Sequence, residues 1–156
     1  MNSGRRQVLK GTGGAAVLGL AMAAGLFRPG SAWAAEWNKA AFDTKSLNDA
    51  VKAMGGGNAA ESKDITITSP DIAENGAVVP FTIASKVPNT AAIAILVEKN
   101  PNMLAAVFDI PAGTDPALST RIKMGQSSNV YALVKADGKY YVASKEIKVT
   151  LGGCGG

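Results

Sequence analysis

The pattern of apolar and polar residues has two different periods along the chain, and the first period is that of a helix. Apolar residues recur at i, i+3, i+4 and i+7 on one helical face at Leu47, Ala50, Val51 and Met54. The segment Asn38–Met54 is therefore predicted to be helical, with its best part from Ser46, which forms a capping-box pattern with Asp49. Gly55-Gly56-Gly57 should end the helix, because glycine adopts the left-handed conformation of a C-terminal cap. We expect this helix to cover a sheet or to form a contact surface.

From Asp64 onward the period is two, which is typical of half-buried strands. The expected strands are Ile65–Thr68, Ala77–Ser85, Ala91–Val97, Met103–Ile110, Ser119–Met124, Val130–Ala136, Lys139–Ser144 and Ile147–Leu151. Pro80 lacks an amide hydrogen and indicates an edge or a bulge. The continuous apolar run Ala91–Val97 is typical of a strand covered on both faces. Asp137-Gly138 predicts a tight hairpin, since both residues tolerate positive φ.

Seven or eight short strands without βαβ alternation predict an all-β fold. Two antiparallel sheets packed face to face, as an immunoglobulin-like β-sandwich with an N-terminal helix, satisfy this pattern. The sandwich domain with its helix is assigned to residues 35–151, between an N-terminal export segment (1–34) and a C-terminal arm (152–156).

The export segment has the features of a twin-arginine signal peptide. Arg5 and Arg6 precede a weakly apolar stretch, Gly11–Phe27, that is short for a membrane span. Ala32-Trp33-Ala34 matches the small-x-small pattern of a signal-peptidase site, and cleavage after Ala34 leaves 122 of the 156 residues. We expect a periplasmic protein with no membrane segment in its mature form; an uncleaved N-terminal anchor is the alternative.

Removing the signal also removes the basic character of the chain. Four of its 16 basic residues lie in the signal, whereas all 12 acidic residues lie after it. The mature domain is thus close to neutral and has no basic run, which argues against nucleic-acid binding.

The absence of histidine and the presence of one cysteine exclude several functions. Blue-copper sites and most catalytic zinc sites need imidazole, and a Cys–His nucleophile pair needs its base. We expect no metal, no cofactor and no catalytic residues in the body of the domain. A single cysteine in an exported protein links to another molecule or works as a free thiol.

That cysteine, Cys154, lies in a tail made otherwise of glycine: Gly152, Gly153, Gly155 and Gly156. Glycines on both sides predict a flexible arm and an uncrowded thiol. If the last strand includes Thr150, four residues give the arm a reach of about 13–14 Å, and its narrow backbone suits a tunnel in another protein. The arm has no basic residue to lower the pKa of the thiol. Cys154 is therefore predicted to be a covalent handle on which other proteins act.

The tail Val149-Thr150-Leu151-Gly152-Gly153-Cys154-Gly155-Gly156 resembles the C-terminal motif of the SoxY family, the carrier subunits of bacterial thiosulfate oxidation. Three internal segments are also similar to the family: Ala73–Pro80, Glu98–Asn102 and Ser119–Met124. The resemblance spans about Phe42 to Gly156, and Met103 departs from it where a second proline is expected.

This resemblance implies an immunoglobulin-like domain paired with a second subunit, SoxZ. It implies that Cys154 carries thiosulfate-derived sulfur as an S-thiosulfonate and then as persulfide species. The implied partners are the haem cytochrome SoxAX, the dimanganese hydrolase SoxB and the sulfane dehydrogenase SoxCD. The residues leave two alternatives: a structural β-sandwich linked by a Cys154–Cys154 disulfide, and a sulfurtransferase whose thiol is activated by Lys145 or Lys148.

Overall fold

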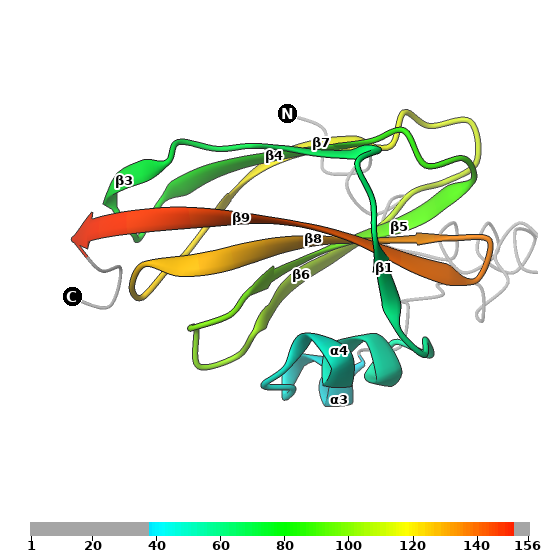
Figure 1. Ribbon diagram of the computed structural model, residues 1–156, viewed down its shortest axis with the longest axis horizontal. Coiled ribbons are helices and arrows are strands. Elements are labelled where there is room, and N and C mark those ends of the chain that lie inside the picture. Colours follow the sequence, from blue (N-terminus) through cyan, green and yellow to red (C-terminus); the bar gives the residue numbers. More distant parts are fainter. Residues whose placement is uncertain (1–37, 152–156) are drawn as a thin grey trace, which may run out of the picture. The chain divides into compact units, whose positions relative to one another are not determined.

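The computed structural model describes residues 38–151, which form two short helices and two packed β-sheets (Figure 1). The helices are α3 (Lys39–Phe42) and α4 (Leu47–Ala53). The strands are β1 (Ala59–Glu61), β2 (Ile65–Thr68), β3 (Ile72–Asn75), β4 (Val79–Ser85), β5 (Thr90–Val97), β6 (Leu104–Asp109), β7 (Ala117–Ile122), β8 (Ser128–Ala136) and β9 (Lys139–Leu151). The predicted all-β sandwich with an N-terminal helical segment is confirmed.

The larger sheet has the order β1-β9-β8-β5-β6, with β3 also paired to β9, and the smaller sheet has the order β2-β4-β7. Apolar side chains between the sheets form the main core, which includes Phe81, Ile83, Ile93, Ile95 and Ile147. Strand β5 is buried from Ala92 to Val97, as expected of a strand covered on both faces. Its alternate residues Ala94 and Leu96 belong to a second cluster beneath the helices.

The predicted helix Asn38–Met54 is interrupted and consists of α3 and α4. The break occurs because Ser46 has an extended backbone (φ −136°, ψ 154°) and accepts the Asp49 amide at 3.1 Å as the N-cap of α4. The helix end is confirmed, since Gly55 has φ +85°. Ala50 and Val51 of α4 are fully buried in the second cluster, so the helix covers the sheet as expected.

Pro80 lies in β4, the middle strand of the smaller sheet, at a point where that strand is locally an edge. Strand β2 pairs with β4 only at Thr82–Ser85, so Pro80 has a strand neighbour on one side, at Arg121 of β7. The Ser69 hydroxyl donates to the Pro80 carbonyl at 2.8 Å just past the end of β2. The missing amide hydrogen of Pro80 therefore interrupts no β2–β4 ladder.

The prediction of two separate strands, Lys139–Ser144 and Ile147–Leu151, is wrong, because Lys139–Leu151 is one continuous strand, β9. The hairpin before it is confirmed, since Asp137 and Gly138 both have positive φ (49° and 73°). Two further strands, β1 and β3, were not predicted, and both pair with β9 in parallel. These two parallel pairings are the exceptions to the antiparallel arrangement of the other strand pairs.

Candidate functional site

The proposed sulfur site, Cys154 with its flanking glycines, lies outside the described residues, as do Arg5, Arg6 and Ala34 of the export signal. The structure does describe the strand from which the arm departs. Strand β9 continues to Leu151, three residues before Cys154. The geometry of this end of β9 therefore determines where the arm begins.

One side of the end of β9 is held by β3. The two strands run parallel, with Ile72 opposite Lys148 and Asn75 opposite Leu151. The Lys148 amide donates to the Asp71 carbonyl at 2.9 Å, and the Gly76 amide donates to the Leu151 carbonyl at 2.8 Å. Backbone bonds therefore hold the strand up to Leu151, the last residue before the arm. We call the segment Lys148–Leu151 the root of the arm.

The other side of the root is held by a side chain. Strand β8 begins at Ser128, opposite Ile147, so its pairing with β9 does not extend to the root. The Ser127 hydroxyl takes over, because it accepts the Val149 amide at 2.9 Å and lies 3.4 Å from the Val149 carbonyl. The Thr150 hydroxyl adds a bond of 3.0 Å to the Glu74 carbonyl. Neither β3 nor Ser127 was identified from the sequence as part of the site.

The position of Leu151 sets the length of the arm. Because the strand includes Leu151, three residues lead to Cys154, and at about 3.3–3.6 Å per extended residue the arm reaches about 10–11 Å. This is shorter than the 13–14 Å expected for a strand ending at Thr150. An active site that acts on the thiol would therefore have to approach the end of β9 closely.

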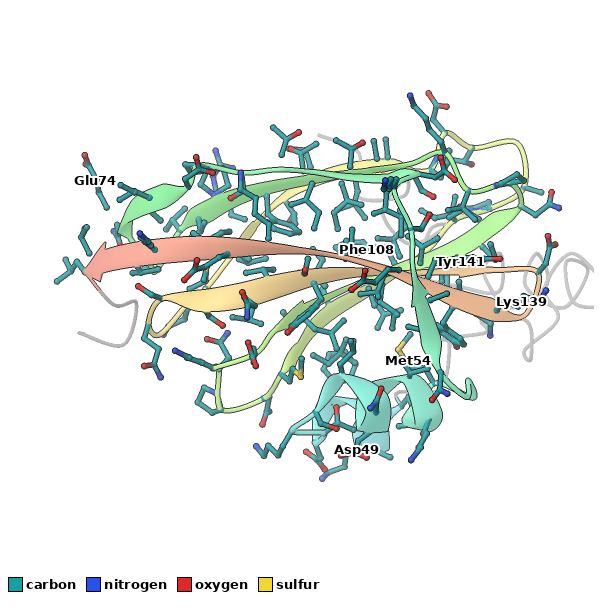
Figure 2. The ribbon with its side chains drawn as sticks, in the orientation of Figure 1. Asp49, Met54, Glu74, Phe108, Lys139 and Tyr141 are labelled. Carbon is teal, nitrogen blue, oxygen red and sulfur yellow. The ribbon has the colours of Figure 1, made fainter. Side chains whose placement is uncertain are left out.

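Several large apolar side chains are exposed in the part of the domain around the root. Ile72, Val78 and Leu151 are 58%, 52% and 66% exposed, and they account for three of the four exposed large apolar residues among residues 38–151. Ile72 lies on β3 and Leu151 on β9, which pair with each other, and Val78 immediately precedes β4 after the turn that follows β3. Figure 2 shows Glu74 at this end of the sandwich and Lys139 at the opposite end.

The two lysines considered as activators of the thiol differ in placement. Lys145 is 26% exposed at its side chain and forms an ion pair of 2.9 Å with Asp71, and its ammonium also donates to the Ser69 carbonyl. It is also six strand residues, about 20 Å, from Leu151, which is twice the reach of the arm. Lys148 is exposed and about 10 Å from Leu151 along the strand, so only this lysine remains for a self-activating thiol.

No group of three or more carboxylate or thiol side chains within residues 38–151 is arranged to hold a metal ion. Burial, and then the charge of Glu98, raises the pKa of Tyr131 above its ordinary value, so this phenol stays neutral. None of the helices in this part of the chain has the length and apolarity of a membrane span.

The three internal segments singled out in the sequence have defined places around the root. Ala73–Pro80 contains most of β3 and the turn that binds Leu151. The other two are joined to each other, because the side-chain amide of Asn100 donates to the Lys123 carbonyl at 2.7 Å. They also connect to the first, through a bond of 2.7 Å from the Met124 amide to the Gly76 carbonyl.

Comparison with known proteins identifies the chain's relatives. Residues 51–154 match the family model of the sulfur oxidation protein SoxY. A solved structure, that of the sulfur carrier protein SoxY from Chlorobium limicola f thiosulfatophilum, is 38% identical, with a TM-score of 0.58 over 66% of this chain and 96% of that chain. No curated protein in the comparison matches this chain. Because the family match covers well over half of its residues and extends to Cys154, the chain belongs to the SoxY family of sulfur oxidation proteins.

Proposed function

We propose that the chain carries sulfur covalently on the thiol of Cys154 and presents it to a series of partner enzymes. Its role as a sulfur carrier in sulfur oxidation accords with its family and its solved relative. The observation that supports the covalent site is that β9, held on both sides, ends three residues before the only thiol of the chain. A fixed root followed by Gly152 and Gly153 keeps that thiol within about 10–11 Å of the end of β9 while leaving it free to move.

Loading and unloading need chemistry that other proteins supply. The Cys154 thiol joins thiosulfate with loss of one proton and two electrons, which gives an S-thiosulfonate. Hydrolysis then adds water across the terminal S–S bond, which releases sulfate and leaves a persulfide. We assign the electrons of loading to SoxAX, the hydrolysis to SoxB and the oxidation of the remaining sulfur to SoxCD. The chain itself acts as a carrier rather than as an enzyme.

The carrier is proposed to work in the periplasm as a heterodimer with SoxZ. Arg5 and Arg6 direct the folded protein to the twin-arginine route, and cleavage follows Ala34. Since that route exports folded proteins, a SoxZ subunit without a signal can leave the cytoplasm bound to this chain. Replacement of Arg5 and Arg6 by lysine should retain both subunits in the cytoplasm; export of SoxZ alone would contradict this step.

The covalent site is tested by intact-mass analysis of the heterodimer from thiosulfate-grown cells. We expect sulfur and sulfonate adducts that map to Cys154, and their complete loss in a Cys154→Ser variant that still folds and binds its partner. Thiosulfate oxidation should fall to background in that variant. Oxidation by Cys154→Ser at the normal rate would overturn the proposal.

A second variant tests the narrowness of the arm. Gly153→Val keeps the thiol but adds a branched side chain beside it, and it should slow every enzyme that must admit the arm. Ser69→Ala is the matched control, because it removes a hydroxyl bound to Pro80 and leaves the arm unchanged. Equal rates for the two variants would show that the enzymes do not enclose the arm.

A further inference from the structure

The partner subunit of the proposed heterodimer needs a docking surface, and the exposed faces and strand edges of the domain are the candidates. The apolar side of α4 is already occupied, because Ala50 and Val51 are buried against Leu133 and Tyr140 of the larger sheet. On one side of the sandwich, β1 and β3 cover much of the edge of β9. On the other side, β6 and β7 each pair with one strand only, so both sheets end in a free edge.

These two free edges border a common groove of about 390 Å³. Its walls include Ala105 and Ala106 from β6 and Thr120 and Arg121 from β7, with Lys123 just beyond β7. A free strand edge presents unpaired amide and carbonyl groups to solvent and pairs readily with another strand. Natural edges are often protected by lysine or proline, but β6 has neither, and its one charge is Asp109 at its last position.

The groove carries positive charge without any compensating acid. No carboxylate lines it, and Arg121 and Lys123 are both exposed. The ion pairs found within residues 38–151 join Lys39 to Asp43 and Lys145 to Asp71, and neither involves the groove. Two unpaired cations beside free backbone groups favour a partner that brings carboxylates together with a strand edge.

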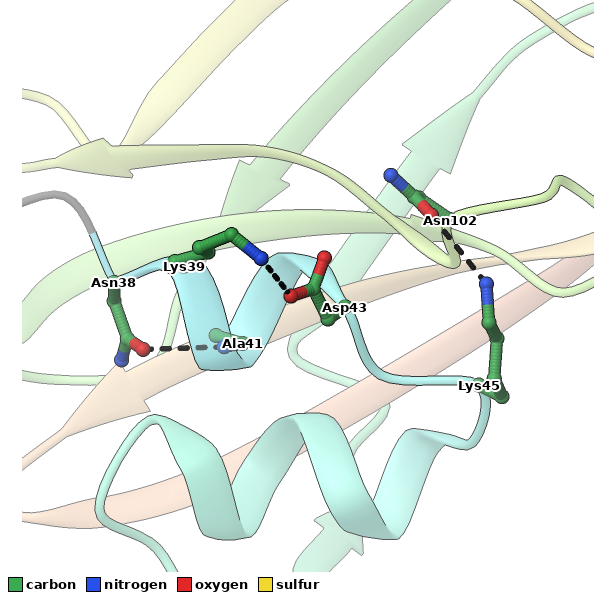
Figure 3. Close-up of polar contacts among 6 residues, drawn as sticks. All are labelled: Asn38, Lys39, Ala41, Asp43, Lys45 and Asn102. Atoms are coloured by element: carbon green, nitrogen blue, oxygen red, sulfur yellow. Dashed lines mark hydrogen bonds and ion pairs between the residues drawn. The ribbon is translucent and has the colours of Figure 1, made fainter.

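The end of the groove is fixed before any partner arrives. The Asn100 side chain bridges two loops, because it donates to the Lys123 carbonyl at 2.7 Å and accepts the Gly125 amide at 3.1 Å. The Lys45 ammonium donates to the Pro101 carbonyl and lies 3.4 Å from the Asn102 side-chain oxygen (Figure 3). A preorganised surface loses less conformational entropy on binding.

Two backbone hydrogen bonds also connect the end of the groove to the root of the arm. Lys123 is followed by Met124, whose amide donates to the Gly76 carbonyl at 2.7 Å. The Gly76 amide in turn donates to the Leu151 carbonyl at 2.8 Å. A protein bound in the groove would therefore lie beside the residue from which the arm departs.

We propose that the groove between β6 and β7 is the docking surface for the second subunit, which pairs with a free strand edge and places carboxylates against Arg121 and Lys123. This inference rests on the proposed heterodimer. Docking here leaves the root and the exposed residues Ile72, Val78 and Leu151 uncovered on the β3 side, where enzymes meet the arm.

The test compares groove variants with matched variants elsewhere, each co-expressed as the complete heterodimer. Arg121→Glu/Lys123→Glu reverses both charges, and Ala105→Arg fills the groove from an exposed position. The controls are Lys86→Glu/Lys139→Glu, which reverses two exposed lysines elsewhere on the domain, and Ala91→Arg, an exposed alanine lining a different groove. Heterodimer affinity is measured by titration and native mass spectrometry, and folding of each lone chain by circular dichroism.

We expect both groove variants to fold and to bind the second subunit at least tenfold more weakly, while both controls bind as the wild type does. The double charge reversal should also reduce the salt dependence of binding. Unchanged affinity in both groove variants would overturn the proposal. So would a groove that proves to hold a second copy of this chain, seen as a homodimer that Ala105→Arg abolishes without affecting the heterodimer.

The two proposals can fail separately. Docking is read from subunit mass, and the carrier function is read from sulfur adducts on Cys154. If Cys154 carries sulfur while the groove variants still bind the second subunit, only the docking surface is wrong. If the groove variants lose the second subunit but wild-type Cys154 never gains sulfur, only the carrier site is wrong.

Discussion

The outer faces of the two sheets differ although both sheets share one core. The larger sheet is covered by α3 and α4, and its outward residues Leu96, Leu133 and Tyr140 are at most 3% exposed. The smaller sheet has no such cover, and its outward residues are small or polar, such as Thr82 and Ser119, whose hydroxyls lie 2.9 Å apart. The larger sheet is therefore buried on both faces where the helices cover it. The smaller sheet closes the core and leaves its own surface open.

Leu133→Ala should show the largest effect of this difference. Its side chain is 1% exposed beneath the helices, and its truncation is expected to lower the free energy of unfolding by about 2–5 kcal/mol. Thr82→Ala on the open face should change it by no more than about 0.5 kcal/mol. Urea unfolding measures both, and equal losses would show that the helices do not enclose a second core.

Gly56→Ala tests how tightly the helices are packed on the sheet. A Cβ at Gly56 would lie 2.4 Å from a ring carbon of Tyr140 and 2.8 Å from a methyl group of Val51. We expect a loss of about 1–3 kcal/mol from overpacking. Gly57→Ala is the matched control, because no other atom lies within 4 Å of the added carbon. If both variants melt at the same temperature, the cover is looser than described.

Tyr140→Phe should have the smallest effect of the three. The Tyr140 hydroxyl donates to the Met54 carbonyl at 2.6 Å and ties the end of α4 to β9. Loss of this bond should cost about 1 kcal/mol, since the carbonyl loses its partner. The neighbouring Tyr141 hydroxyl makes no such bond within the described domain, so Tyr141→Phe should cost less. Thermal unfolding of the two variants provides the comparison, and the reverse order would contradict this role for Tyr140.

The sequence predicted what depends on local pattern. The capped start of α4 at Ser46, the Asp137-Gly138 hairpin and the doubly buried strand β5 each follow from the chemistry of neighbouring residues. The break between α3 and α4 was missed because the extended backbone that Ser46 needs as an N-cap cannot be shared with a continuous helix.

The contacts that hold the root of the arm could not be predicted from the local sequence pattern. Strand β3 has four residues and pairs in parallel with a segment 76 positions later, so nothing near Ile72 or Asn75 indicates its partner. Ser127 resembles any loop serine until the fold places it beside Val149. The thiol itself was identified easily, because composition alone isolates Cys154. The contacts that hold the root of the arm could be identified only from the folded structure.

The parallel pairing of β3 with the end of β9 has a mechanical consequence. Under the proposed function, an enzyme that drew in the arm would pull β9 along its own axis, toward its carboxyl end. Under that tension, the bonds to β3 and β8 are loaded together in shear, whereas a force across the strands would open them one after another. A pull on Leu151 would therefore be shared among these bonds, which would help to keep the end of β9 from unravelling.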